Sequence, residues 1–175
     1  MHYFLASRKD LRIPDGKLLH IAPETCLTSE LRELASNTYV SCDLFRSDVN
    51  VQLNIEQMPF SDDAFDVIFC SHVLPEVEKD NLAIMELRRV LNPRGWALVS
   101  VPSHGENTTE VRPGDGHEAP PEFFRIYGSD FSIALTEQGF DVETVQLDEV
   151  LNQEQQTKMR VNRQTASAIY ILRKI

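Results

Sequence analysis

The stretch KLLHIAPETC, residues 17–26, decides the fold, because a short apolar run leads into a proline-containing bend and then into a helix-like pattern. In doubly wound α/β sheets, a small ligand binds beyond the carboxyl end of such a strand, where the next helix begins. The bend contains no glycine, and none occurs between Gly16 and Gly95. The G-x-G-x-x-G pattern that lets backbone approach a pyrophosphate is therefore absent. The stretch predicts a strand that carries a ligand-binding loop, and it argues against a dinucleotide as the ligand.

The rest of the chain alternates strand-like and helix-like patterns around this first strand. Apolar residues recur at helical spacing after Cys26, with Thr28 as the expected N-cap, and Ser129 is expected to cap a later helix. This alternation predicts an α/β sheet with right-handed crossovers. No strongly periodic helix precedes the last strand, which is therefore expected to be antiparallel. The predicted strands are residues 17–22, 38–42, 65–70, 96–101, 140–147 and 166–172, with a short peripheral strand near 49–53 and a helix at 80–91.

The length of 175 residues, with 42% hydrophobic residues, fits one globular domain over residues 1–175. Residues 103–127 carry glycines and prolines but no regular period, and residues 148–164 form a polar connection. A loop as long as 103–127 inside a compact domain is usually functional or mobile. We therefore expect substrate contacts in this loop.

The formal net charge is −10, from 27 acidic and 17 basic residues. Nucleic-acid binding needs a basic surface that displaces counterions, and anionic membranes also attract basic segments. We therefore expect no nucleic-acid partner and no membrane association. Three cysteines are too few and too scattered for a disulfide framework or a metal site, and no apolar run approaches the ~18 residues of a membrane span. The sequence predicts a cytoplasmic protein without a metal.

Acidic and polar residues follow the predicted strands. Asp43 ends the second strand, 19 residues after Glu24, where a carboxylate can accept both hydroxyls of a ribose. The alternative interpretation of Asp43 is a cap at the end of its strand. Asn54 and Ile55 precede the central strand, where they can contact the amino edge and the face of an adenine. Taken singly, they are more often a turn residue and a core residue.

Three longer stretches carry a family resemblance: NIEQMPFSDDAFDVIFCSHVL (residues 54–74), ELRRVLNPRGWALVSVP (86–102) and RIYGSDF (125–131). With the first-strand loop and the acidic end of the second strand, they resemble the class I S-adenosylmethionine-dependent methyltransferases, in particular the type 11 branch. Within that branch, the chain is similar to the subgroup with His-x-Ala-Pro-Glu in place of the glycine-rich loop, here residues 20–24. The resemblance covers about residues 17–146.

The resemblance implies a three-layer, Rossmann-like methyltransferase sheet of seven strands, mostly parallel, with a final antiparallel strand and a pocket for S-adenosylmethionine. This cofactor contains no phosphate, so the missing glycines fit it better than a dinucleotide. The implied contacts run from the amino-acid end of the cofactor past the sulfonium to the ribose and the adenine. The corresponding residues are His20, Ala22 and Glu24, then Ser71 and His72, then Asp43, and last Leu44, Asn54 and Ile55.

Candidate contacts to the methyl acceptor are His104, His117, Arg125 and Tyr127, which lie in or beside the long loop. For the two histidines, the alternative is a solvated loop position, and their spacing is not that of zinc ligands. Transfer of a methyl group from sulfur to a nucleophile needs no covalent enzyme intermediate, so no catalytic residue is assigned.

The expected function is methyl transfer from S-adenosylmethionine to an unidentified small-molecule or protein acceptor. The alternative is a degenerate methyltransferase fold that senses the cofactor or binds a partner without catalysis. A nicotinamide-dependent oxidoreductase is a distant third, because the phosphate-binding glycines are missing. Only 16 residues precede the first strand, which leaves room for a second copy or another chain to cover the pocket.

Overall fold

The computed structural model describes residues 8, 11, 16–34, 38–111, 120, 122–146 and 167–175. The predicted connection at residues 148–164 lies outside them. Strands and helices alternate along most of the described chain. The elements are β1 (Leu18–Ile21), α2 (Thr25–Leu34), β2 (Tyr39–Asp43), β3 (Val51–Gln52), β4 (Phe65–Ser71), the 3-10 helix η1 (Leu74–Glu76), α3 (Asp80–Val90), β5 (Leu91–Pro102), β6 (Thr109–Glu110), β7 (Arg125–Ile126), α4 (Phe131–Glu137), β8 (Phe140–Gln146) and β9 (Ser167–Lys174).

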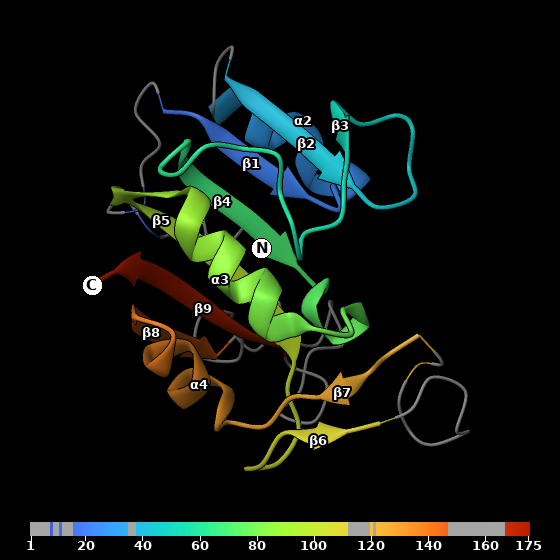
Figure 1. Ribbon diagram of the computed structural model, residues 1–175, viewed down its shortest axis with the longest axis vertical. Coiled ribbons are helices and arrows are strands. Elements are labelled where there is room, and N and C mark those ends of the chain that lie inside the picture. Colours follow the sequence, from blue (N-terminus) through green and yellow to red (C-terminus); the bar gives the residue numbers. More distant parts are fainter. Residues whose placement is uncertain are drawn as a thin grey trace, which may run out of the picture.

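Seven strands form one sheet in the order β3-β2-β1-β4-β5-β9-β8 (Figure 1). The five strands β3, β2, β1, β4 and β5 run parallel to one another. β9 is antiparallel to both of its neighbours, β5 and β8. The prediction of a mostly parallel α/β sheet with an antiparallel last strand is therefore confirmed. The order reverses between β1 and β4, so this is the switch point where such sheets bind ligands.

Helices cover both faces of the sheet, which makes three layers (Figure 1). The face under α3 and α4 packs Leu19 and Ile68 with Leu87, while the opposite face packs Leu18 and Val67 with residues of α2. Neighbouring residues of β1 and β4 thus point to opposite faces, as the period of two in a strand requires. Both faces are apolar because both are covered.

Three boundaries differ from the sequence expectations. α2 begins at Thr25, so Thr28 lies inside the helix, where its Oγ1 donates a hydrogen bond of 2.9 Å to the carbonyl of Glu24. α4 begins at Phe131 with Asp130, not Ser129, in the N-cap position. β5 extends back to Leu91, which pairs with Phe65 across an irregular register. At α4, Asp130 accepts hydrogen bonds from Thr108, which is distant in sequence, and β5 is lengthened by its pairing with β4.

The long loop contains structure of its own. β6 and β7 pair as a short antiparallel ribbon, and the bridge from Ser103 to Tyr127 closes its base. Figure 1 shows this ribbon beyond the start of α3, away from the main sheet. Among the described residues, no helix is both long and apolar enough to cross a membrane.

Candidate functional site

The bend after β1 is turned by an alanine. Ala22 has a φ of +47°, a left-handed conformation that L-residues other than glycine rarely adopt, and its N–H donates 2.8 Å to the carbonyl of Cys42. Such a conformation disfavours a residue with a Cβ by roughly 1–2 kcal/mol. Strained backbone of this kind clusters at ligand sites. The bend then leads through Pro23 to Glu24 at the start of α2.

His20 lies beneath this bend, and its side chain is completely buried. Its Nδ1 is 2.8 Å from the hydroxyl of Tyr39, and its Nε2 is 3.4 Å from Oε2 of Glu24. In the neutral ring that donates from Nε2 to the carboxylate, Nδ1 accepts from the tyrosine hydroxyl. Because His20 is fully buried, its ring contacts Tyr39 and Glu24 and exposes no surface of its own.

Glu24 is the acidic group at this bend, and its side chain is 32% exposed. Burial raises the pKa of this carboxyl, but hydrogen bonds with His20 and Ser71 outweigh the effect of burial, so that its pKa lies below the ordinary value. Glu24 is therefore ionised at neutral pH. A partly exposed carboxylate held in one orientation is suited to binding a cation.

Ser71 and His72 lie at the carboxyl end of β4, beside β1. Ser71 is 6% exposed and accepts a hydrogen bond of 3.0 Å from the hydroxyl of Ser100. His72 also has a left-handed backbone, with φ of +57°. Burial lowers the pKa of His72 below its ordinary value, although the negative charge of Glu24 acts in the opposite direction. Its imidazole is therefore neutral at pH 7.

Asp43 ends β2, as the sequence predicts. Its Oδ1 accepts hydrogen bonds from the N–H groups of Phe45 and Arg46, at 2.8 and 2.9 Å. The carboxylate thus caps the strand end, and this fixes its orientation. Leu44 and Phe45 follow it with exposed fractions of 49% and 82%, so they present exposed apolar surface at this edge of the sheet.

Arg46 is a site residue that the sequence analysis missed. Its Nη1 donates 2.6 Å to the carbonyl of Pro23, and its guanidinium also pairs with Asp48. Arg46 therefore joins the loop after β2 to the bend after β1. The only sequence signal for this role was its position three residues after the strand-end Asp43.

Asn54 and Ile55 follow the edge strand β3. Asn54 is exposed, and its Oδ1 accepts a hydrogen bond of 2.9 Å from the N–H of Glu56, as a turn residue does. Ile55 is only 6% exposed and belongs to the core. Asn54 therefore presents a side chain to solvent, whereas Ile55 has little surface left for a ligand.

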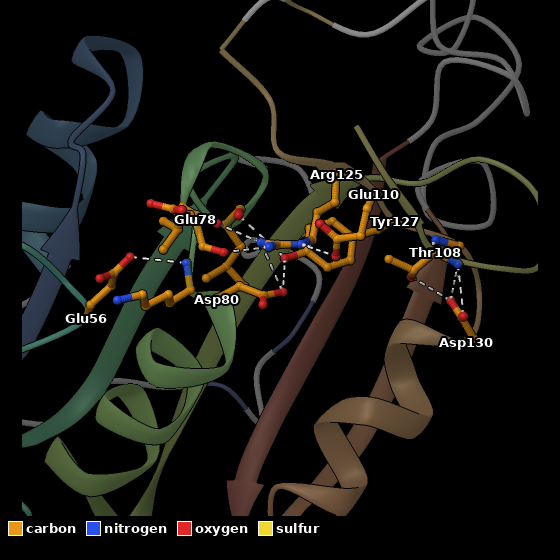
Figure 2. Close-up of polar contacts among 12 residues, drawn as sticks. Glu56, Glu78, Asp80, Thr108, Glu110, Arg125, Tyr127 and Asp130 are labelled. Carbon is orange, nitrogen blue, oxygen red and sulfur yellow. Dashed lines mark hydrogen bonds and ion pairs between the residues drawn. The ribbon is translucent and has the colours of Figure 1, made fainter. Parts of the chain in front are cut away.

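Of the candidate acceptor contacts, His104, Arg125 and Tyr127 lie on the β6–β7 ribbon or at its base, where the N–H of His104 donates 2.8 Å to the carbonyl of Tyr127. His104 is exposed, and His117 lies outside the described residues. Arg125 and Tyr127 are 5% and 1% exposed, and their polar atoms contact residues 74–80 and Glu110 (Figure 2). Within the described ranges, no group of three or more His, Cys, Asp or Glu side chains is arranged to hold a metal ion.

A family model described as a methyltransferase domain matches residues 24–99. This span begins at Glu24 and includes Asp43, Asn54, Ser71 and His72. No curated protein matches the sequence. The family match covers the part of the chain that carries most of the candidate site.

Solved structures of methyltransferases resemble the whole chain. A Burkholderia thailandensis 1,6-didemethyltoxoflavin-N1-methyltransferase, with its substrate and S-adenosylhomocysteine bound, matches with a TM-score of 0.72 at 12% identity, covering 99% of this chain and 76% of that one. An S-adenosylmethionine dependent methyltransferase from Mesorhizobium loti matches with a TM-score of 0.69 at 13% identity, covering 99% and 98%. A Haloferax volcanii chain in complex with a methyltransferase activator gives 0.67 at 13%, covering 99% and 88%. At these identities the comparison concerns the fold, which is the Rossmann-like methyltransferase fold.

Proposed function

We propose that this protein is an S-adenosylmethionine-dependent methyltransferase with a small-molecule or protein acceptor that is not yet identified. The observation that carries the proposal is the ionised, oriented Glu24 at the switch point between β1 and β4. The match of residues 24–99 to a methyltransferase domain supports it. So does the bound S-adenosylhomocysteine of the Burkholderia neighbour.

Glu24 is proposed to bind the ammonium group at the amino-acid end of the cofactor. His20 positions the carboxylate from below, and Tyr39 holds the tautomer of His20 that donates to it. A carboxylate that meets a cation forms a charge-assisted hydrogen bond, which contributes about 1.5–3 kcal/mol in favourable settings. The loop needs no glycine for this contact, because a side chain and not the backbone meets the ligand.

Asp43 is proposed to bind the ribose hydroxyls. The two backbone N–H groups on Oδ1 keep the carboxylate in place, and Oδ2 would accept from the ribose. Leu44 supplies exposed apolar surface for the adenine, and Asn54 would accept from its amino group with a remaining lone pair of Oδ1. Ile55 supports the adenine side from within the core.

Ser71 and His72 are proposed to flank the sulfonium. When bound, S-adenosylmethionine supplies an electrophilic methyl group on a positively charged sulfur. The lowered pKa of His72 keeps its ring neutral, so that no second positive charge lies beside the sulfonium. In an in-line transfer, the protein contributes mainly by positioning the two reactants and excluding water. A second copy or another chain over the open edge of the site would complete this exclusion.

The test is a calorimetric titration of the whole chain with S-adenosylhomocysteine and with 5′-methylthioadenosine, which keeps the nucleoside but lacks the amino-acid end. Glu24→Gln should weaken binding of the first ligand by about tenfold and leave the second unchanged, because only the ammonium contact is lost. Glu33→Gln, an exposed change on the same helix, is the control and should affect neither.

Asp43→Ala is expected to weaken both ligands by about tenfold, since both contain the ribose. If neither compound binds the unmodified protein at about millimolar concentration, the proposed function is wrong. If both bind but Glu24→Gln weakens them equally, the assignment of Glu24 to the amino-acid end is wrong.

A further inference from the structure

A cavity of about 190 Å³ lies between the start of α3, the β6–β7 ribbon and α4. None of its lining residues belongs to the bend after β1 or to the ends of β2 and β4. It is only somewhat larger than the cavity of about 150 Å³ that holds a benzene molecule in an engineered protein. It therefore fits a ligand with a single ring or a short branched chain.

One wall of this cavity is apolar and partly aromatic. The rings of Tyr127 and Phe131 are 4.2 Å apart at their centres and tilted by 45°, and both side chains are almost fully buried. Ile84 from α3 and Ala134 from α4 extend this wall. Aromatic faces attract organic cations as well as neutral rings.

The polar wall carries an excess of negative charge. Asp80, Glu110 and Asp130 line the cavity, against the single positive charge of Arg125. Thr108 donates to Asp130 from its N–H and its hydroxyl, at 2.9 and 2.7 Å, and these hydrogen bonds lower the pKa of Asp130. Asp130 is therefore ionised at neutral pH.

Arg125 does not provide an anion site, because the protein itself occupies its guanidinium (Figure 2). Nη1 and Nη2 donate to the carbonyls of Val77 and Glu78 at 2.6 and 2.8 Å. Its Nε lies 3.2 Å from Glu110, and Nη1 lies 3.3 Å from Asp80. An incoming carboxylate would therefore meet the surplus acidic groups and not a free cation.

We propose that this cavity binds a small organic monocation, an amine carried on an aromatic or branched apolar body. The apolar part would pack against Tyr127, Phe131 and Ile84. The ammonium would lie beside the carboxylate of Asp130, because those of Asp80 and Glu110 are paired with Arg125. This proposal does not rest on the proposed function, since it uses none of the residues assigned to S-adenosylmethionine.

The test is a calorimetric titration of the whole chain with benzylamine, benzyl alcohol and benzoate at neutral pH and low ionic strength. These probes share one ring and differ in charge. A ligand of this size is expected to bind with a dissociation constant of about 1 mM. The alcohol should bind at least about tenfold more weakly than the amine, and benzoate should show no binding, because the excess carboxylates repel it.

Variants distinguish binding inside the cavity from a general effect of surface charge. Ala134→Phe places a ring in the cavity from an exposed helix position and should abolish benzylamine binding. Asp130→Asn keeps an oxygen for Thr108 but removes the charge, and should weaken benzylamine roughly fivefold. Glu137→Gln makes the same charge change on an exposed residue of α4 that does not line the cavity, and should leave binding unchanged.

Several outcomes would overturn the proposal. They are no benzylamine binding up to about 20 mM, equal binding of the alcohol, undiminished affinity in Ala134→Phe, or an equal loss in Glu137→Gln and Asp130→Asn. A parallel titration with S-adenosylhomocysteine on the same preparation keeps this result separate from the proposed function. Its failure together with benzylamine binding would overturn only the methyltransferase proposal.

Discussion

Two polar clusters near the carboxyl end of the sheet differ in how their charges are satisfied. At the bend after β1, Glu24 is 32% exposed and rests on buried His20, with left-handed backbone at Ala22 and His72. On the ribbon, Arg125 is 5% exposed and bonded to carbonyl and carboxylate oxygens of the protein (Figure 2).

A structural ion has its hydrogen-bonding positions filled by the protein, whereas a binding group keeps some of them exposed. Arg125 connects β7 to the segment that leads into α3. Its guanidinium N–H groups donate to carbonyl and carboxylate oxygens of the protein. Glu24 receives enough hydrogen bonds to stay ionised but keeps an exposed side, and it follows a strained bend. We therefore expect variants of the Arg125 cluster to change stability and variants of the bend to change ligand binding.

The largest expected effect is that of Arg125→Ala. It would leave the carbonyls of Val77 and Glu78 and the partly buried carboxylate of Asp80 without their donor. Hydrogen bonds to a charged group contribute about 1.5–3 kcal/mol, and we expect a loss of this size. Urea unfolding followed by circular dichroism measures the loss. Arg94→Ala, at an exposed position, is the control and should change the unfolding free energy little. Equal stability of the two variants would mean that the Arg125 cluster is not a structural anchor.

A smaller effect is expected from the titration of His72. Its pKa is lower in the folded protein than its ordinary value of 6.5, so the unfolded chain takes up the proton first as pH falls. The folded state should therefore lose stability as pH decreases from about 6.5 toward the lowered pKa. The slope should stay well below the limit of about 1.4 kcal/mol per pH unit, because His72 is an exposed residue and solvent screens its interactions.

The measurement is urea unfolding at a series of pH values between about 7.5 and 5. His72→Asn should remove this component of the pH dependence, while His104→Asn, at an exposed position of the ribbon region, should leave it unchanged. A pH dependence that is the same in the original protein and in His72→Asn would show that His72 is not desolvated in the folded state.

The smallest expected effect is that of Ala22→Gly. Glycine adopts the left-handed conformation without steric strain, but it also gives the unfolded chain more freedom, so a net stabilisation of about 0.5–1 kcal/mol is expected. Thermal unfolding measures whether the substitution raises or lowers the stability of the protein. Ala134→Gly, inside α4, is the matched comparison and should destabilise by about 1 kcal/mol. Destabilisation of similar size in both variants would contradict strain at the bend.

Much of the fold was predictable because its signals are local. The strand-like apolar run of residues 65–70 and the helical spacing of 80–91 each predicted an element within one or two residues of its position. Element ends were less predictable, as Thr28 and Ser129 show. The helices begin at Thr25 and Phe131 instead, and at α4 the N-cap residue Asp130 bonds to the distant Thr108. The short ribbon inside residues 103–127 gave no periodic signal, since two-residue strands are too short to have one.

The α/β layering, the antiparallel last strand and the positions of Glu24 and Asp43 at strand ends all follow from the linear pattern of residues. Parallel strands bring their carboxyl ends to one edge, so a linear pattern was sufficient for these conclusions. Only the tertiary structure decided that His20 lies beneath Glu24, that Ile55 is mostly in the core, and that Arg125 bonds to the protein itself. Burial and hydrogen-bond partners depend on which elements pack together across the chain, and a one-dimensional pattern does not contain that information.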